Sequence, residues 1–182
     1  MIITIGGYPG SGKSTAASYL AKKFKLKHMS IGDFRREMAM KRGMTLEELN
    51  KLGEKQAFTD KEADDFLKKL GKKDNLIIDA RLGWHFIPKS VKIFLKVKPE
   101  AGAERIFREK RESEKKYKNI SEVVKANKKR IESDIKRYRK YYGLNPYNIS
   151  NYDIIIDTSA MSIKEMCIVT EKAVSAFIKK DI

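Results

Sequence analysis

The chain contains a single cysteine and no long apolar run, and each absence excludes a class of protein. Cys167 is the only cysteine among 182 residues, so an intramolecular disulfide and a metal site built from several cysteines are excluded. No stretch approaches the roughly 18 to 20 consecutive apolar residues of a membrane-spanning helix. The first residues are apolar and lack the basic leader of a signal peptide. We therefore expect a cytoplasmic protein without a membrane partner.

Internal repeats, low-complexity segments and Pro/Gly-rich hinges are missing as well. A chain of 182 residues is long enough to bury a hydrophobic core without disulfides. The only two histidines, His28 and His85, have no partner at metal-ligand spacing. These features predict one α/β domain without a histidine metal site.

Positive charge, by contrast, is in excess. The chain holds 40 Lys and Arg against 24 Asp and Glu, a net charge of +16, and residues 101–142 contribute half of that excess. Such a surface could attract RNA. No RGG tract, zinc pattern or aromatic RNP-like strand accompanies it, so we expect no specific nucleic-acid partner. An ATP-dependent RNA- or ribosome-associated protein stays as a remote alternative.

A phosphate-binding loop follows the first apolar segment. Residues 7–14 read Gly-Tyr-Pro-Gly-Ser-Gly-Lys-Ser, which matches G-x-x-x-x-G-K-[ST]. An apolar run at 1–5 suits a buried strand, and residues 14–24 have helical periodicity. Backbone N–H groups and the helix N-terminus would surround phosphate oxygens, Lys13 would reach the β- and γ-phosphates, and Ser14 would ligate Mg²⁺. The residues expected to bind ATP are Gly7, Tyr8, Pro9, Gly10, Ser11, Gly12, Lys13, Ser14 and Thr15.

Further apolar segments at 26–29, 75–79, 91–97 and 152–157 alternate with helical patterns, which is typical of a parallel sheet covered on both faces. Capping boxes at Thr45–Glu48 and Ser162–Glu165 predict helix starts. Two helical stretches are additional to this array. We divide the single domain into a core of residues 1–29, 74–98 and 150–182, an excursion at 30–73 and a basic helical region at 99–149.

A second anion site is indicated where the second strand ends, in Ser30-Ile-Gly-Asp-Phe-Arg-Arg36. The alternative is an ordinary helix start that is capped by Ser30 or Asp33 and carries an arginine on the protein surface. The segment resembles the Ser-x-Gly-Asp-x-x-Arg motif of nucleoside monophosphate kinases. By that resemblance Arg36 would hold the acceptor monophosphate, and Arg35 is an additional cation.

The third strand ends in Asp79-Ala-Arg-Leu-Gly-Trp84. A carboxylate at this place, Asp79, can hold Mg²⁺ directly or through water, and Arg81 would point into the same crevice. The segment resembles the archaeal-type cytidylate kinases, in which the arginine bridges donor and acceptor phosphates. This sequence departs from the pattern in two places: Ala80 replaces a usual glycine, and the Leu-Gly-Trp stretch is one residue short. Bacterial cytidylate kinases carry an acid directly after the arginine, where this chain has Leu82. Base contacts made by that acid are therefore not transferred.

The basic region supplies two further sets. Arg105, Arg108 and Arg111 recur every three residues, as expected of lid arginines that close over the transferring phosphoryl group. Arg130, Asp134 and Arg137 match the Arg-x-x-x-Asp-x-x-Arg array of cytidylate kinases and would share one helix face. A solvated, salt-bridged helix is the alternative. The ending Tyr-Asp-Ile-Ile-Ile-Asp-Thr at 152–158 also resembles the archaeal type, so the resemblance covers nearly the whole chain.

The resemblance implies a three-layer phosphate-loop kinase fold with a five-stranded parallel sheet of order 2-3-1-4-5, and transfer of the γ-phosphoryl of MgATP to a nucleoside monophosphate. CMP or dCMP is the expected acceptor of a monomeric enzyme; AMP or UMP, or a small hydroxylated metabolite, are the alternatives. The acceptor-binding residues would be Ser30, Gly32, Asp33, Arg36, Arg81, Arg130, Asp134 and Arg137. Those acting in the transfer would be Lys13, Arg36, Arg81, Arg105, Arg108 and Arg111.

Overall fold

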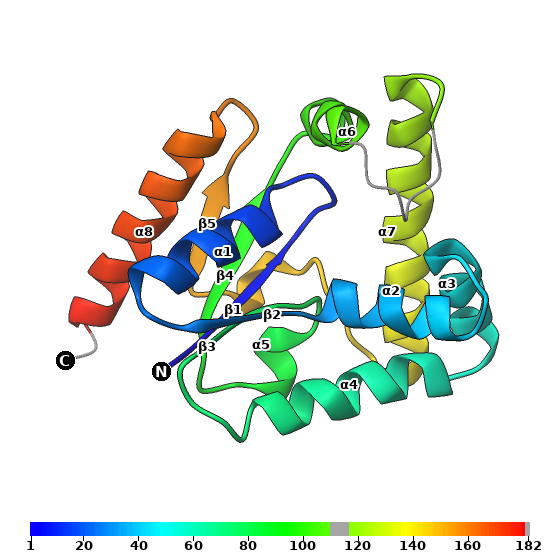
Figure 1. The fold of residues 1–182 in the computed structure, drawn as a ribbon, viewed down its shortest axis with the longest axis horizontal. Coiled ribbons are helices and arrows are strands. Elements are labelled where there is room, and N and C mark those ends of the chain that lie inside the picture. The colour runs from blue at the N-terminus through cyan, green and yellow to red at the C-terminus, as the bar shows by residue number, and fades with distance from the viewer. Residues whose placement is uncertain (110–116, 181–182) are drawn as a thin grey trace.

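A five-stranded parallel sheet forms the centre of the molecule (Figure 1). The computed structural model describes residues 1–109 and 117–180. The strands are β1 (Ile2–Gly7), β2 (Lys27–Ser30), β3 (Leu76–Asp79), β4 (Val91–Lys96) and β5 (Ile154–Asp157). They lie in the order β2-β3-β1-β4-β5, and every neighbouring pair is parallel. The expected fold and strand order are confirmed, with strand ends that differ by one or two residues.

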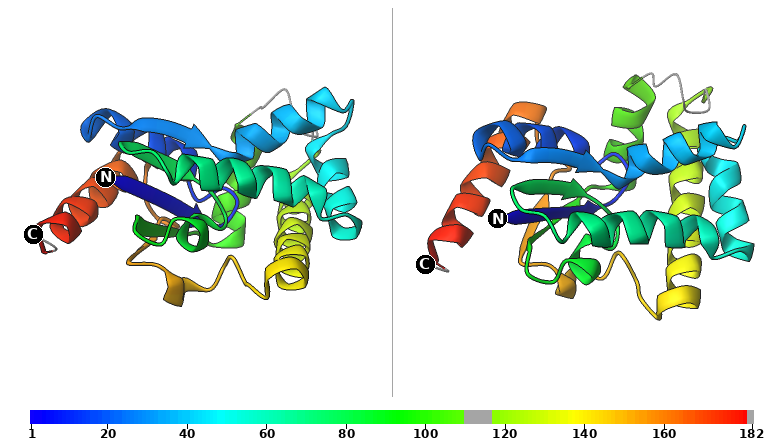
Figure 2. Two further views of the ribbon diagram at one scale, coloured as in Figure 1. Left: turned by 90° about the horizontal axis from the view of Figure 1, so that it is seen from below. Right: turned by 60° about the horizontal axis from the view of Figure 1, so that its bottom comes forward.

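Helices cover both faces of the sheet because its central strands are apolar on both sides. Ile3 and Ile5 pack with α1 (Lys13–Lys23) and α8 (Ile163–Lys180) on one face. Ile78 and Phe94 point to the other face, where α4 (Phe58–Leu70), α5 (Gly83–Phe86) and the segment 144–152 lie (Figure 2). The short helix α5 has no counterpart in the sequence-based prediction.

Two helical groups extend from the sheet. The first contains α2 (Ile31–Lys41), α3 (Leu46–Lys55) and α4; the second contains α6 (Pro99–Arg108) and α7 (Ile120–Tyr142), before the 3-10 turn Ile149–Asn151. The groups contact each other, since the Tyr141 hydroxyl donates to the Gly53 carbonyl at 2.7 Å and Ser133 donates to Glu54 at 2.8 Å. In Figure 1, α2, α3 and α7 lie together on the side away from α8.

Local signals in the sequence place several helix ends. Both capping boxes are confirmed: Glu48 and Glu165 each accept from the backbone N–H of the capping residue, at 2.7 and 2.8 Å. Gly143 ends α7 in the left-handed conformation, with φ of +69°. These ends were predictable because they depend on contacts between near neighbours in the chain.

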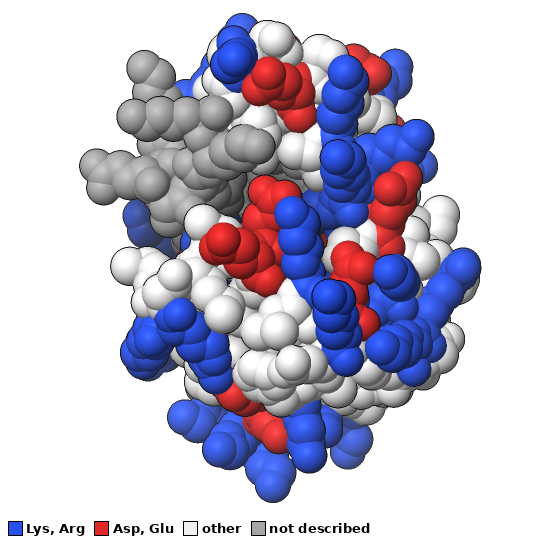
Figure 3. Space-filling model, turned by 90° about the vertical axis from the view of Figure 1, so that its right-hand side faces the viewer, with Lys and Arg blue, Asp and Glu red and all other residues white. Residues whose placement is uncertain are grey.

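The excess charge is not gathered into a uniform basic surface on the side formed by α2, α3 and α7. Figure 3 shows acidic side chains lying among the basic ones on this face. None of the helices in residues 1–109 and 117–180 combines the length and apolar character needed to cross a membrane.

The phosphate-binding loop lies against the first turns of α6. A Cβ atom built on Gly102 would lie 2.7 Å from the carbonyl oxygen of Pro9 and 3.1 Å from a methyl group of Val97. A Cβ on Gly10 would lie 2.2 Å from the Gly102 carbonyl oxygen. Only glycine at both positions permits this backbone contact. The contact therefore fixes the position of the loop relative to α6.

Substitution of Gly102 by alanine is expected to displace the loop and weaken ATP binding about tenfold or more, because misplacements of the order of 1 Å in binding groups are costly. The free energy of unfolding should change little, since alanine favours the helix by about 1 kcal/mol and offsets the crowding. Titration calorimetry with ATP and chemical denaturation measure the two quantities. Unchanged ATP affinity would contradict this coupling.

Candidate nucleotide-binding site

The loop at residues 7–14 has the conformation of an anion trap. Gly12 precedes α1 in the left-handed region, with φ of +88°, so the helix N-terminus turns toward the loop. The Lys13 ammonium donates to the Tyr8 carbonyl at 2.8 Å, which folds this side chain back over the loop. The Ser11 hydroxyl oxygen is buried without a hydrogen-bond partner among the described residues. The left-handed Gly12 and the start of α1, which both line the cavity, are therefore the features of this loop that suit phosphate.

Two oxygen groups suited to Mg²⁺ meet at the end of the loop. The Ser14 hydroxyl donates to Asp79 Oδ2 at 2.7 Å, and Asp79 is buried at the end of β3. Within the part of the chain that the structure describes, no cluster of three or more His, Cys, Asp or Glu could hold a metal. This donor set fits Mg²⁺, which is bound in such sites by one or two protein oxygens together with substrate phosphates.

A cavity of about 630 Å³ opens beside the loop and continues between the two helical groups. That size falls in the range of small-molecule sites. Its walls carry twice as many cations as carboxylates. The cations are Lys13, Arg35, Arg36, Arg81, Arg105, Arg108, Arg130 and Arg137, and the carboxylates are Asp64, Asp79, Glu109 and Asp134. The cavity is therefore suited to more than one phosphate-bearing ligand.

The second predicted anion site lies on this wall. Ser30 caps α2 by accepting from the Asp33 N–H at 3.2 Å, and Asp33 pairs with Arg36 at 2.5 Å. Ser30, Gly32 and Arg36 all line the cavity. The helix cap therefore does not exclude the predicted anion site, and binding of phosphate by this segment stays a prediction.

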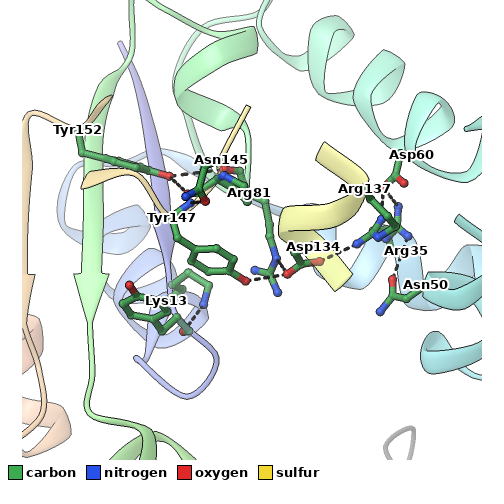
Figure 4. Close-up of polar contacts among 12 residues, drawn as sticks. Lys13, Arg35, Asn50, Asp60, Arg81, Asp134, Arg137, Asn145, Tyr147 and Tyr152 are labelled. Carbon is green, nitrogen blue, oxygen red and sulfur yellow. Dashed lines mark hydrogen bonds and ion pairs between the residues drawn. The ribbon is translucent and has the colours of Figure 1, made fainter. Parts of the chain in front are cut away.

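Two buried aspartates connect the arginines at the back of the cavity (Figure 4). Asp134 on α7 forms an ion pair with Nε of Arg81 and accepts from Arg137 at 2.6 Å. Asp60 on α4 pairs with Arg137 and accepts from Arg35 at 2.9 Å. The network therefore joins α2, α4 and α7 to the segment after β3.

This network also reaches the phosphate-binding loop. The Tyr147 hydroxyl donates to Asp134 at 2.7 Å, and the Tyr147 ring stacks on Tyr8 with centroids 5.2 Å apart and planes 5° apart. Burial alone would raise the pKa of Asp134, but Arg81 and Arg137 outweigh it and lower that pKa to about 2. Asp134 is therefore an anion at neutral pH and holds both arginines in place.

Comparison with known proteins identifies the family of this chain. A family model described as an AAA domain matches residues 6–124. The chain is 34% identical to a cytidylate kinase of Methanopyrus kandleri over 193 aligned residues, covering 100% of this chain and 96% of the relative. It is 36% identical to a cytidylate kinase of Methanocaldococcus jannaschii, covering 96% and 97%. The chain belongs to the cytidylate kinase family.

Solved structures place this family member among phosphate-loop kinases by fold. Shikimate kinase from Bacteroides thetaiotaomicron superposes with a TM-score of 0.69 at 16% identity, covering 98% of both chains. At that identity the likeness concerns the fold alone. The resemblance noted from the sequence, by contrast, is confirmed by relatives aligned over nearly the whole chain.

The predicted lid arginines of this family member occupy different environments. Arg105 donates to Thr158 and Met161 carbonyl oxygens, at 2.5 and 3.0 Å, and so ties α6 to the loop before α8. Arg108 is 77% exposed and pairs with Glu104 at 2.5 Å, at the cavity edge. Arg111 lies outside the described residues. Contact of these arginines with phosphate stays a prediction.

Asp60 and Asp64 were not singled out in the sequence, although a signal for them exists. The two aspartates lie on the buried face of α4 with Ala63, Leu67 and Leu70. Charged residues in register with an apolar helix face are rarely buried without a partner. That pattern marks them as members of a polar site, but it does not name the partners, which come from distant segments.

Replacing Asp60 by alanine is expected to lower the free energy of unfolding by about 3–5 kcal/mol, because Arg35 and Arg137 would remain buried without their shared counter-charge. Chemical denaturation measures the change. The matched control is Asp65→Ala on the same helix, whose half-exposed side chain pairs only with Lys68 among the described residues. It should change stability by about 0.5 kcal/mol or less. Equal effects of the two substitutions would contradict the role of Asp60.

Lys13 provides a test by proton uptake. Burial lowers its pKa to about 7, and pairing with phosphate would raise it. At pH 8 the lysine of the empty site is mostly neutral, so binding of ATP should take up close to one proton, whereas at pH 6 it should take up almost none. Calorimetry in buffers of different ionisation enthalpy measures this number. The control Lys13→Arg, always protonated, should show no uptake at either pH.

Proposed function

We propose that this protein transfers the γ-phosphoryl group of ATP, as its magnesium complex, to CMP or dCMP and releases the diphosphate. The single observation that supports this best is the continuous cavity, which joins the phosphate-binding loop to the Arg36 and Arg81 wall. Loop proteins with other functions need a phosphate site at the loop only. The cytidylate kinase relatives give the acceptor class.

The loop and its surroundings would bind the donor. The residues at 7–15 would enclose the ATP phosphates, and Lys13 would neutralise charge on the β- and γ-phosphates. Ser14 and Asp79 would hold Mg²⁺, directly or through water. When bound, that ion neutralises the phosphate oxygens and fixes their orientation. The Lys13 side chain needs only to leave the Tyr8 carbonyl to reach a phosphate.

The acceptor phosphate would lie between Arg36 and Arg81. The ion pair of Arg81 with Asp134 engages Nε, and its two Nη groups form no hydrogen bond to the described residues. They would remain for phosphate oxygens. Ser30 and Gly32 would form the adjoining wall, where Asp33 would orient Arg36 through their ion pair. Arg130, Asp134 and Arg137 would help to hold the CMP.

The reaction requires positioning and neutralisation rather than proton removal. Phosphoryl transfer passes through a loose transition state with charge spread over the equatorial oxygens. The acceptor phosphate oxygen is already an anion, so no general base is required. Arg105, Arg108 and Arg111 would complete the neutralisation when the lid closes, and closure would exclude the water that hydrolyses ATP. The same proposal includes a monomeric, cytoplasmic enzyme.

Turnover of CMP, dCMP, UMP, AMP and GMP with MgATP, followed by coupled ADP release, tests this proposal. We expect the highest kcat/KM with CMP or dCMP. Lys13→Ala and Arg81→Ala should each lower turnover by about 10²–10⁴-fold with the fold intact by circular dichroism, since each removes one preorganised charge. Near-normal turnover by folded Lys13→Ala protein would refute the mechanism. Salt-sensitive RNA binding without turnover of any acceptor would instead favour the RNA-associated alternative.

A further inference from the structure

Two carboxylates that line the cavity, Asp64 and Glu109, have no role in the proposed transfer, and Asp64 is the buried one. Asp64 lies on α4, one helical turn after Asp60, and is only 4% exposed. It lines the cavity. Its Oδ2 accepts a hydrogen bond from the Tyr142 hydroxyl, and its Oδ1 has no hydrogen bond to the described residues. Asp64 therefore presents one fixed, unused acceptor to the cavity.

The walls around Asp64 suit a flat aromatic ring. Ala63 and Leu67, which flank it on the same face of α4, pack in one apolar cluster with Ile31 and Ala80. Ile31, Leu67, Ala80, Leu82 and Tyr138 line the cavity with Asp64. An apolar wall that carries a polar group can recognise an aromatic ring by its face and its edge together.

The charge state of Asp64 is suited to accepting a hydrogen bond. Burial raises its pKa to about 6, against the opposing effect of the Tyr142 hydrogen bond, so the group is ionised at pH 7.5. Asp60 adds to the rise, whereas Arg35 and Lys68 oppose it. A buried carboxylate with a vacant oxygen favours a ligand that donates a hydrogen bond to it, because an unpaired buried acceptor is costly.

We propose that Asp64 selects the base of the acceptor nucleotide, with Oδ1 accepting a hydrogen bond from the 4-amino group of cytosine. This inference rests on the proposed function. In uracil the same ring position carries a carbonyl oxygen, which cannot donate and is repelled by a carboxylate. Tyr142 is the positioning residue: it occupies Oδ2 and fixes the direction of Oδ1.

The first test uses the unaltered protein and three acceptors: CMP, UMP and the 5′-monophosphate of pyrimidin-2-one riboside, which has hydrogen in place of the 4-amino group. Removal of a hydrogen bond to a charged partner should lower kcat/KM about 10- to 100-fold relative to CMP. Equal kcat/KM for CMP and this analogue would overturn the proposal. The comparison needs no variant, so it stands even if substitution at Asp64 prevents folding.

The second test is Asp64→Asn, which keeps the size of the side chain and can donate to the uracil carbonyl. The kcat/KM for CMP should fall about 10- to 100-fold, mostly through KM, and the preference for CMP over UMP should be lost. The matched control Asp65→Asn, at the neighbouring half-exposed position, should leave both acceptors unchanged. An equal fall for CMP, UMP and the analogue would show a structural role only and would overturn the proposal.

These experiments separate the role of Asp64 from the proposed function. If the unaltered protein phosphorylates CMP but ignores the 4-position of the base, the role of Asp64 is wrong and the proposed function stands. If the unaltered protein phosphorylates no nucleoside monophosphate, the proposed function itself is wrong.

Discussion

The cavity depends on the sharing of two buried aspartates among three arginines. A buried charge without a counter-charge is strongly destabilising, so Asp60 and Asp134 each require their arginines, and Arg137 requires both. Replacing such a network by apolar residues often costs little free energy of unfolding, so we look for its contribution in the geometry of the site. Here it holds cations from α2, α7 and the segment after β3 around one space, in fixed directions.

The parallel sheet determines where the chemistry lies. Parallel strands bring their carboxyl ends to one edge, where open α/β sheets bind ligands. Asp79 is level with Ile5 on one side and with Ser30 on the other. The phosphate-binding loop, the Ser30 segment and the Asp79 segment therefore begin side by side. The two helical groups cover this edge of the sheet, and α7 supplies Asp134 and Arg137.

Most of this site was predictable because its signals are local. The loop at 7–14, the strand-end segments with Ser30 and Asp79, and the capping boxes each depend on residues close together in the sequence, and strand order followed from the family resemblance. Asp60 and Tyr147 were not predictable in their roles. Asp60 meets Arg137, which lies 77 residues further along the chain, and Tyr147 meets Tyr8 near the start of the chain. Such contacts arise only after the helices have packed, and no local pattern encodes them.

The central place of β1 has a consequence for synthesis on the ribosome. This strand is made before both of its partners: Ile2 pairs with Leu76, and Ile3 pairs with Val91. Until β4 has left the ribosome, the apolar strand that carries the nucleotide loop lacks a neighbour on at least one side. The nascent chain must therefore avoid pairing of this apolar strand with the edge strand of another sheet while the later segments are still being translated.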